Sequence, residues 1–541
     1  MRIWIRMSQR AVCASIPLQI RVVSIVLFLC IFLPAIGCGQ RIEPEFFVYQ
    51  GAFRLPEGSN GSDWNFSATA MTFIPGGDPS GPDDGFPGSI IACGHDQQMM
   101  LSEILIPVPV ISPEKNPEDL NTAETLQPFY DIRTAAYSFI DPYNIPVLGI
   151  EYLPEATDLS AGKLHFCWGQ HIQYGEPSHG FCQTTLDQPQ TAGPWHLGNH
   201  NNYTTNDYLF EVDPVWADAY APGQRLATGR FREGVWSGYG PALYVYAPDS
   251  LESNGTLEAI TPLLLYGEDD PALGEIVVSE EMRMDEYHLA DDWSGGAWLS
   301  AYEYSAVIFA GTKGLGNGWY GFSDGTVWPY EGPYPPVPPV PHDSRGYWAD
   351  SIGAEILFYD PEDLGRVTNG TMQPYEPQPY AALDLVPYLY NPGYDYWRGK
   401  RHLLGACCFD RENGIVYLAE RIADEDKSLI HVWRIETPTQ TGRSGDSKIQ
   451  TFFLESYPNP FNAGTVIRYT LSSESAVRLC VYDLRGREVR MLVSNKMQSG
   501  GSHSIFWEGE SSQGQPLPSD VYLLVLNASQ MRQTIKLTLL K

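Results

Sequence analysis

The stretch Gly405-Ala406-Cys407-Cys408-Phe409-Asp410 is followed by Gly414-Ile415-Val416-Tyr417-Leu418-Ala419-Glu420 and then by Ile430-His431-Val432-Trp433-Arg434-Ile435. These runs are short and mainly apolar, and turn-forming residues such as glycine, asparagine and aspartate separate them. That alternation is typical of β-strands joined by tight turns. The stretch therefore predicts a strand–turn–strand unit that is closed by a third strand.

The same unit recurs at three earlier places in the chain, and no sustained 3.6-residue apolar period interrupts the region. Strand units that cannot bury a face alone are what a β-propeller is built from. We therefore expect an all-β fold, with an irregular β-propeller of five to seven blades over residues 45–436. Weaker copies at residues 207–248 and 354–390 would supply further blades, and a sandwich or β-helix is the alternative. The three clear copies are residues 70–75 with 89–96, 149–154 with 163–171, and 298–302 with 305–312.

Length and charge narrow the class of protein. A chain of 541 residues exceeds what one ordinary hydrophobic core supports. It carries 34 basic and 65 acidic residues, which gives a formal net charge of −31. Such a charge repels phosphate backbones, so nucleic acid is excluded as an expected partner.

The N-terminus predicts export. Arg2, Arg6, Arg10 and Arg21 precede or open an apolar run at residues 22–36 that ends in small residues, which is a signal-peptide pattern within residues 1–39. The run is shorter than the roughly 20 residues that a membrane-spanning helix needs, so we expect a mature chain without a transmembrane helix. The predicted location is secreted or on the outer cell surface. Acylation of Cys38, as in a lipoprotein, is the alternative.

Cysteine usage predicts one disulfide, with two free thiols as the alternative. In an oxidising compartment Cys167 and Cys182 are the expected disulfide pair. They bracket His171 and His179, which superficially resembles a zinc site, but the spacing fits no standard zinc pattern. We therefore predict no metal at this loop.

A polar linker at residues 437–450 precedes a region of regularly alternating strands at residues 451–541, compatible with a small antiparallel sandwich. Five ordered motifs lie in that region: Tyr457-Pro458-Asn459-Pro460-Phe461-Asn462, Tyr482-Asp483-Leu484-Arg485-Gly486-Arg487, Phe506-Trp507-Glu508-Gly509, Val521-Tyr522 and Lys536-Leu537-Thr538-Leu539-Leu540-Lys541.

Together these motifs resemble the type IX secretion C-terminal sorting domain, which is similar in fold to the immunoglobulin-like domain of flagellar hook-capping proteins. The resemblance implies a bacterial protein that crosses an outer membrane with the secretion machinery as partner. The domain would then be removed or used for surface attachment. An accessory fold without a sorting role is the alternative.

Candidate site residues are the polar residues that follow the apolar strands, among them Glu420 and Arg421, because propeller ligands usually meet loops at strand ends. Asp96 and Glu420 are a candidate acid and base for glycoside cleavage. His95 and His171, if brought around one channel, would suit a metal or a substrate hydroxyl, but hydrogen bonds to a neighbouring blade are the preferred interpretation. The weaker binding candidates are His95, Gln97, His171, and the aromatic rings of Trp236 and Tyr239 on which sugars stack.

The sequence favours an exported recognition module that binds a glycan or a protein outside the cell. A secreted polysaccharide-active enzyme is one alternative, so whether the chain is an enzyme stays open. A calcium-stabilised structural surface protein is another, with residues 76–84 as the candidate loop and calcium as the only cofactor indicated. The proline-rich residues 330–341 predict extended polyproline geometry, interpreted as a stiff surface loop or as a ligand for a proline-binding groove.

Overall fold

A computed structural model describes residues 39–78, 84–133, 147–154, 162–169, 177–230, 234–252, 255–270, 274–438, 453–457, 459–462, 464–471, 475–498, 501–528 and 531–541. The expected signal peptide, apart from residue 39, and most of the expected linker lie outside these residues. No helix within the described ranges is long and apolar enough to cross a membrane.

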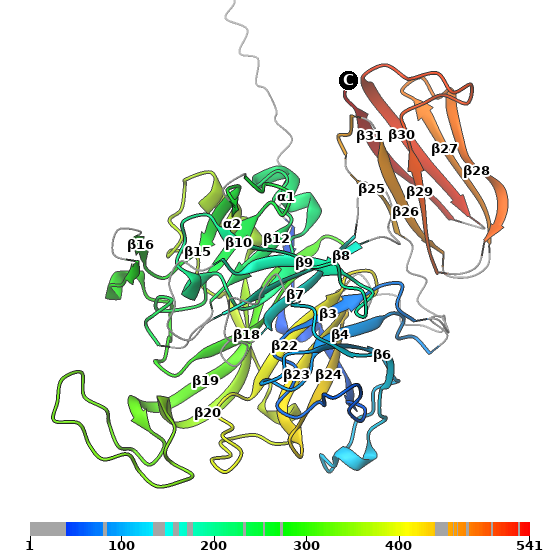
Figure 1. The fold of residues 1–541 in the computed structure, drawn as a ribbon. Helices are drawn as coiled ribbons and strands as arrows, with labels where there is room; N and C mark the ends of the chain where they lie inside the picture. The colour runs from blue at the N-terminus through cyan, green and yellow to red at the C-terminus, as the bar shows by residue number, and fades with distance from the viewer. Residues whose placement is uncertain are drawn as a thin grey trace, which may run out of the picture. The chain divides into compact units, whose positions relative to one another are not determined.

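The predicted all-β class is confirmed (Figure 1). Strands dominate the described residues, and the α-helices among them are α1 (Pro214–Tyr220) and α2 (Pro361–Thr368), both short. Each has an aspartate at its N-cap, which accepts hydrogen bonds from the first free N–H groups of the helix. None of the sheets described below closes on itself.

Residues 39–438 form five sheets, and each sheet has four main strands that are antiparallel. The first contains β3 (Met71–Ile74), β4 (Ser89–Cys93), β5 (Leu101–Leu105) and β6 (Glu124–Tyr130). The second contains β7 (Val147–Pro154), β8 (Gly162–Trp168), β9 (His179–Gln183) and β10 (Ala192–Leu197), with β14 (Thr256–Leu257) at its edge. The third contains β11 (Leu209–Glu211), β12 (Leu226–Gly229), β13 (Leu243–Tyr246) and β15 (Ile260–Leu264).

The fourth sheet contains β18 (Asp292–Ala301), β19 (Tyr304–Phe322), β20 (Arg345–Tyr359) and β21 (Ala381–Asp384), with β1 (Gln40–Arg41) beside β19. The fifth contains β22 (Leu404–Asp410), β23 (Ile415–Asp424), β24 (Lys427–Ile435) and β2 (Phe47–Arg54). A separate small hairpin joins β16 (Glu268–Asp270) and β17 (Glu275–Val277).

The predicted strand–turn–strand units coincide with β3/β4, β7/β8, β18/β19 and β22/β23. The expectation of a separate blade at residues 354–390 is wrong. That segment supplies the end of β20 and β21, which are the outer strands of the sheet that β18 begins. The long β19–β20 connection separates the paired strands in sequence, so the local pattern could not reveal their pairing.

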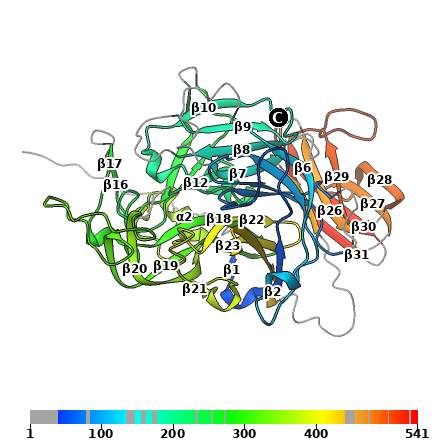
Figure 2. The same ribbon diagram turned by 60° about the horizontal axis from the view of Figure 1, so that its bottom comes forward.

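The five sheets pack face to face in a cyclic order. Their first strands touch in the order β3, β7, β11, β18, β22 and back to β3. Figure 2 shows β18 beside β22 in this arrangement. Five apolar clusters fill the spaces between neighbouring sheets, and adjacent strand residues such as Ile90 and Ile91 face different clusters because side chains alternate. Each fully buried large aliphatic or aromatic residue contributes about 1.5–3 kcal/mol. Pairs that represent the clusters are Ile91 with Phe166, Leu197 with Leu226, Phe210 with Phe309, Ile308 with Leu418, and Ile90 with Val432.

The strand β2 completes the last sheet although it comes before the first one in sequence. It pairs antiparallel with β24, from Phe47 opposite Ile435 to Arg54 opposite Leu429. Arg54 Nε also donates to Asp424 Oδ2 at 2.9 Å. The two ends of the 39–438 region are thereby joined in one sheet.

Residues 453–541 form two sheets around a core of their own. One contains β25 (Phe453–Tyr457), β26 (Thr465–Leu471) and β29 (Gly501–Trp507). The other contains β28 (Glu488–Gln498), β27 (Ser475–Asp483), β30 (Asp520–Ala528) and β31 (Met531–Leu539). Buried residues of both sheets, including Ile467, Leu479 and Trp507, share one apolar cluster. This arrangement agrees with the small antiparallel sandwich that the sequence predicts.

Candidate functional site

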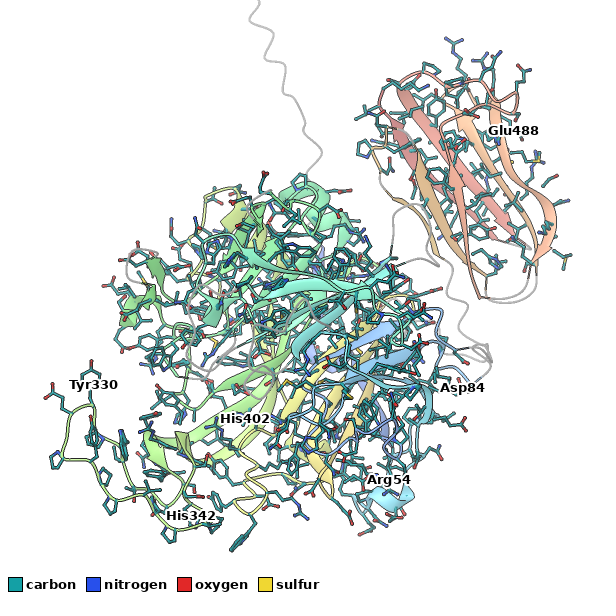
Figure 3. The ribbon with its side chains drawn as sticks, in the orientation of Figure 1. Arg54, Asp84, Tyr330, His342, His402 and Glu488 are labelled. Atoms are coloured by element: carbon teal, nitrogen blue, oxygen red, sulfur yellow. The ribbon has the colours of Figure 1, made fainter. Side chains whose placement is uncertain are left out.

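A group of charged residues gathers at one end of the first strands, and we name it the central polar cluster. In an antiparallel sheet the start of the first strand and the end of the second lie at the same end. Four of the five sheets contribute from those positions, and Figure 3 shows His402 toward the middle of the region. The corresponding positions of the β7 sheet lie outside the described residues. The cluster consists of Asp96, Asp207, Arg230, Asp292, His402 and Arg421.

Arg421 interacts electrostatically with three carboxyl groups of the cluster. Its backbone N–H donates to Leu403 O at 3.0 Å, which fixes it at the start of β22. Burial lowers the pKa of Arg421, and the charges of Asp96, Asp292 and Asp207 act against that effect. Its Nε is buried, and no hydrogen bond or ion pair within the described ranges engages the guanidinium. Arg421 is thus a half-buried cation that interacts electrostatically with several carboxyl groups without being bonded to one.

Two carboxyl groups of the cluster differ in protonation. Burial raises the pKa of Asp207 well above its usual value, and the charge of Asp292 raises it further. Burial acts the same way on Asp292, but the pKa of Asp292 is lowered overall by His402 and Ser294. His402 Nδ1 lies 3.0 Å from Asp292 Oδ2, and Ser294 Oγ donates to the same oxygen at 2.9 Å. Asp207 therefore keeps its proton under conditions in which Asp292 is ionised.

Arg230 connects the cluster to the loop that carries the predicted aromatic residues. It is fully buried, donates to Gly240 O at 3.0 Å and Gly234 O at 3.1 Å, and its charge lies 5.1 Å from the centre of the Trp293 ring. The braced loop, residues 234–240, presents Trp236 as an exposed ring, whereas Tyr239 packs against Tyr287 with Arg283 over its face.

Of the residues predicted at strand ends, Asp96 and Arg421 are brought together. Burial raises the pKa of Asp96, while Arg421 and His95 lower it. His95 Nδ1 lies 3.4 Å from Asp96 Oδ1 and accepts the Gln97 N–H at 3.2 Å, so it acts within its own turn. His171 lies outside the described residues.

Glu420 faces away from the cluster although it precedes Arg421. Its oxygens accept from Tyr390 N at 2.8 Å and Asn391 N at 2.7 Å, and one lies 2.9 Å from His431 Nε2. Burial alone would raise the pKa of Glu420, but His431, Lys400 and these N–H groups lower it overall. Neighbouring side chains of a strand point to opposite faces, which separates Glu420 from Asp96 and Arg421.

Cys167 and Cys182, the expected disulfide, are not brought together and are both free and buried. Cys167 lies opposite His179 on the neighbouring strand, whereas Cys182 lies opposite Leu164. Leu164 and Cys167 are three residues apart, so the two sulfurs lie on opposite faces of the sheet. Cys167 Sγ donates instead to Asp207 O at 2.9 Å, next to the central polar cluster.

A second polar cluster links all five first strands near their other ends. Thr72 Oγ1 and Glu211 N each donate to the Glu151 carboxyl at 3.1 Å. Arg411 donates to Glu211 O at 3.2 Å and also to Ser300. Burial raises the pKa of Glu151 to about 8, and the charge of Glu211 adds to the effect. Glu151 is therefore largely a neutral carboxyl at pH 7.

We expect Glu151→Gln to remove a pH dependence of stability. The pKa of Glu151 is raised from 4.5 to about 8 in the folded chain. Its contribution is complete below pH 4.5 and is lost as the pH rises through 8, by roughly 5 kcal/mol. Urea unfolding at pH 5 and pH 8 measures it, with exposed Glu124→Gln as control. An unchanged difference between the two pH values in Glu151→Gln would refute the assignment.

The motif predicted for sorting is joined to the last strand of the chain. Phe461 is buried against Trp507, and its N–H donates to Thr538 O at 2.9 Å. Asn459 accepts from Thr538 N at 2.7 Å and donates to Lys536 O at 2.6 Å. Tyr457 ends β25 and Asn462 is exposed, while Pro458 lies outside the described residues.

The described residues hold no group of three His, Cys, Asp or Glu side chains that could bind a metal ion. The candidate calcium loop, residues 76–84, is described only in part, and Asp84 there accepts the Phe86 N–H at 2.9 Å in a local turn (Figure 3). The sequence did not single out Asp207, Arg230, Asp292 or His402. The signal for three of them is a polar residue directly before, or at the start of, a first strand.

No protein-family model and no curated protein matches the chain. Among solved structures, the chain is similar to PorZ, described as an essential bacterial surface component of the type-IX secretion system of Porphyromonas gingivalis, with 11% identity and a TM-score of 0.28. The match covers 90% of this chain and 53% of PorZ, so the chain spans about half the length of PorZ.

Two further similarities are weaker. FlgD from P. aeruginosa is 22% identical over 17% of this chain and 74% of its own, with a TM-score of 0.13. Dimeric latent PorU from Porphyromonas gingivalis is 11% identical over 57% of this chain and 32% of its own, with a TM-score of 0.16. At these TM-scores the similarities assign neither a fold nor a function to this chain.

Proposed function

We propose that the chain is an exported recognition module. Its five sheets are the blades of a β-propeller within residues 45–436, which binds a glycan or a protein outside the cell at the central polar cluster. The cyclic packing of the first strands, the five apolar clusters between sheets and the pairing of β2 with β24 support this architecture. The second polar cluster supports it as well, because its bonds link β3, β7, β11, β18 and β22 around one axis.

Residues 1–39 are the proposed signal peptide, residues 437–450 the linker, and residues 451–541 an immunoglobulin-like sorting domain recognised by the type IX secretion machinery. Asn459 and Phe461 of the motif form hydrogen bonds with β31, the last strand of the chain. These bonds support a structural role for the motif, because they attach it to that strand.

The observation that carries the recognition proposal is the state of Arg421. The guanidinium of Arg421 is half-buried, and its unpaired Nε costs free energy because the hydration that this atom loses is not replaced. A ligand oxygen would supply the missing partner, and the planar fork of arginine suits carboxylate and vicinal oxygen groups. The protonated carboxyl of Asp207 would donate a further hydrogen bond.

Replacing Arg421 with glutamine is expected to weaken ligand binding at least tenfold while leaving the stability unchanged or higher. An array of neutral and acidic glycans, together with surface proteins of the producing cell, identifies the ligand on the full chain. Calorimetry then compares Arg421→Gln with Arg366→Gln, whose arginine is exposed and pairs only with Asp363. Full binding by Arg421→Gln would place the ligand elsewhere and overturn the site.

The second candidate function is hydrolysis of a glycosidic bond, and one observation favours it. Glycosidases need one protonated and one ionised carboxyl, and Asp207 and Asp292 have pKa values that are shifted in opposite directions. In this candidate they take the roles of acid and base that the sequence suggested for Asp96 and Glu420. Release of reducing sugar by the wild type and its loss in Asp207→Asn would establish it.

A further inference from the structure

The hairpin of β19 and β20 extends beyond its sheet and ends in a long connection, residues 323–344. The two strands stay paired as far as Phe322 opposite Arg345. Figure 1 shows the connection reaching away from the other strands, and Figure 3 shows Tyr330 at its tip, where the side chain is 99% exposed. None of the apolar clusters between the five sheets contains a residue of this connection, so the packing of the sheets does not explain its presence.

Proline dictates the backbone of residues 334–341. Prolines at 335, 336, 338, 339 and 341 fix their own φ near −65°. The residue before each proline is kept out of the helical region, which restricts Tyr334, Val337 and Val340 to extended geometry. Residues 334–338 accordingly adopt polyproline II geometry, which has three residues per turn and a rise of about 3.1 Å per residue. Residues 339–342 form a turn, in which the His342 N–H donates to Pro339 O at 3.0 Å.

Burial along the segment follows the same period of three. Pro335 and Pro338 are half-buried, so one face of the helix packs against the protein. The next face carries Tyr334 and Val337, which are 57% and 60% exposed, and Val340, which is 65% exposed, follows in the turn. Tyr334 and Val337 form an exposed apolar stripe about 9 Å long.

Both ends of the segment are held by packed side chains. Tyr334 stacks on Trp328 with 4.8 Å between ring centres, and the Arg345 charge lies 4.6 Å from the Trp328 ring. His342 contacts Ser323 Oγ at 2.8 Å and lies 5.1 Å from the Tyr396 ring. A stripe that is already ordered loses little conformational entropy on binding.

We propose that residues 334–341 are a docking ligand for a second protein, whose groove is lined with aromatic residues and accepts a polyproline II helix. Such grooves take up exposed apolar side chains from one face of the helix. Exposed Glu331 and Asp343 flank the stripe. The nearby Arg345 makes a cation–π contact with the Trp328 ring. The partner groove therefore carries a basic rim. The proposal is independent of the central polar cluster.

Photo-crosslinking on the full chain tests the proposal. A benzophenone side chain is placed at Val337 and, in a control chain, at Val327, which is 58% exposed on the same arm but outside the stripe. The chains are displayed on the cells that make the protein. We expect an adduct with one protein from position 337 only, mapped to tryptophan or tyrosine residues of a groove with a basic rim.

A synthetic peptide of residues 330–342 should suppress the adduct at least tenfold, whereas the same peptide with Val337→Asp should not. Full-length Val337→Asp should keep the melting temperature of the wild type, because the side chain is exposed. Equal adducts from positions 337 and 327, no adduct, an adduct with a second copy of the chain or with glycan, or failure of the peptide to compete would each overturn the proposal.

Discussion

Replacing Glu420 with alanine is expected to lower the free energy of unfolding of residues 39–438 by about 4 kcal/mol. The side chains of Glu420, Lys400 and His431 are each 0% exposed, with Glu420 oxygens 4.0 Å from Lys400 Nζ and 2.9 Å from His431 Nε2. Alanine removes the carboxylate nearest to the buried Lys400 charge, and it takes the acceptors from Tyr390 N and Asn391 N. Urea unfolding followed by tryptophan fluorescence measures the loss.

The control is Glu57→Ala, because Glu57 is 95% exposed and lies 3.4 Å from Lys427 Nζ. An exposed pair of this kind contributes at most about 1 kcal/mol. The comparison also separates the two roles considered for Glu420. Loss of glycan cleavage with stability kept within about 1 kcal/mol of the wild type would favour the catalytic role that its position after an apolar strand suggested.

Local sequence pattern is sufficient for the strands but not for their order around the fold. The runs at β22, β23 and β24 alternate with turn residues, and pairing between neighbours in sequence follows from turn geometry. The pairing of β2 with β24 has no such signal, because more than 370 residues separate Arg54 from Leu429. The outer strands β20 and β21 were misassigned for the same reason.

The sequence pattern indicated two residues of the central polar cluster, but it missed Arg230, which follows β12, and the three residues at or before the start of a strand. Asp96 and Arg421 were found because polar residues end an apolar run. Asp207, Asp292 and His402 stand at or before the start of a strand. Because neighbouring strands are antiparallel, the start of one strand lies at the same end of the sheet as the end of the next. A shift of one position decides which face a side chain takes, and that shift sends Glu420 and Arg421 to different environments.

Removing residues 40–54 is expected to abolish the native structure of residues 55–438. The deletion takes β2 from β24 and removes Phe47 and Phe53, which are buried in two different apolar clusters. It also leaves β24 as an uncovered edge whose N–H and C=O groups lack partners, and such edges pair with other chains. A loss of several buried aromatic contacts and one strand of hydrogen bonds approaches the roughly 5–15 kcal/mol that stabilises a typical domain. Limited proteolysis and light scattering of the deleted chain measure the outcome.

A synthetic peptide of residues 40–54 should restore protease resistance when added during refolding, because the gap beside β24 fits that strand in one register. The matched control removes residues 268–277, whose small β16–β17 hairpin belongs to none of the five sheets, and it should remain folded. If the chain without residues 40–54 stays monomeric and resists proteolysis as the control does, the five sheets do not depend on closure by β2. The pairing of β2 with β24 would then no longer support the propeller proposal.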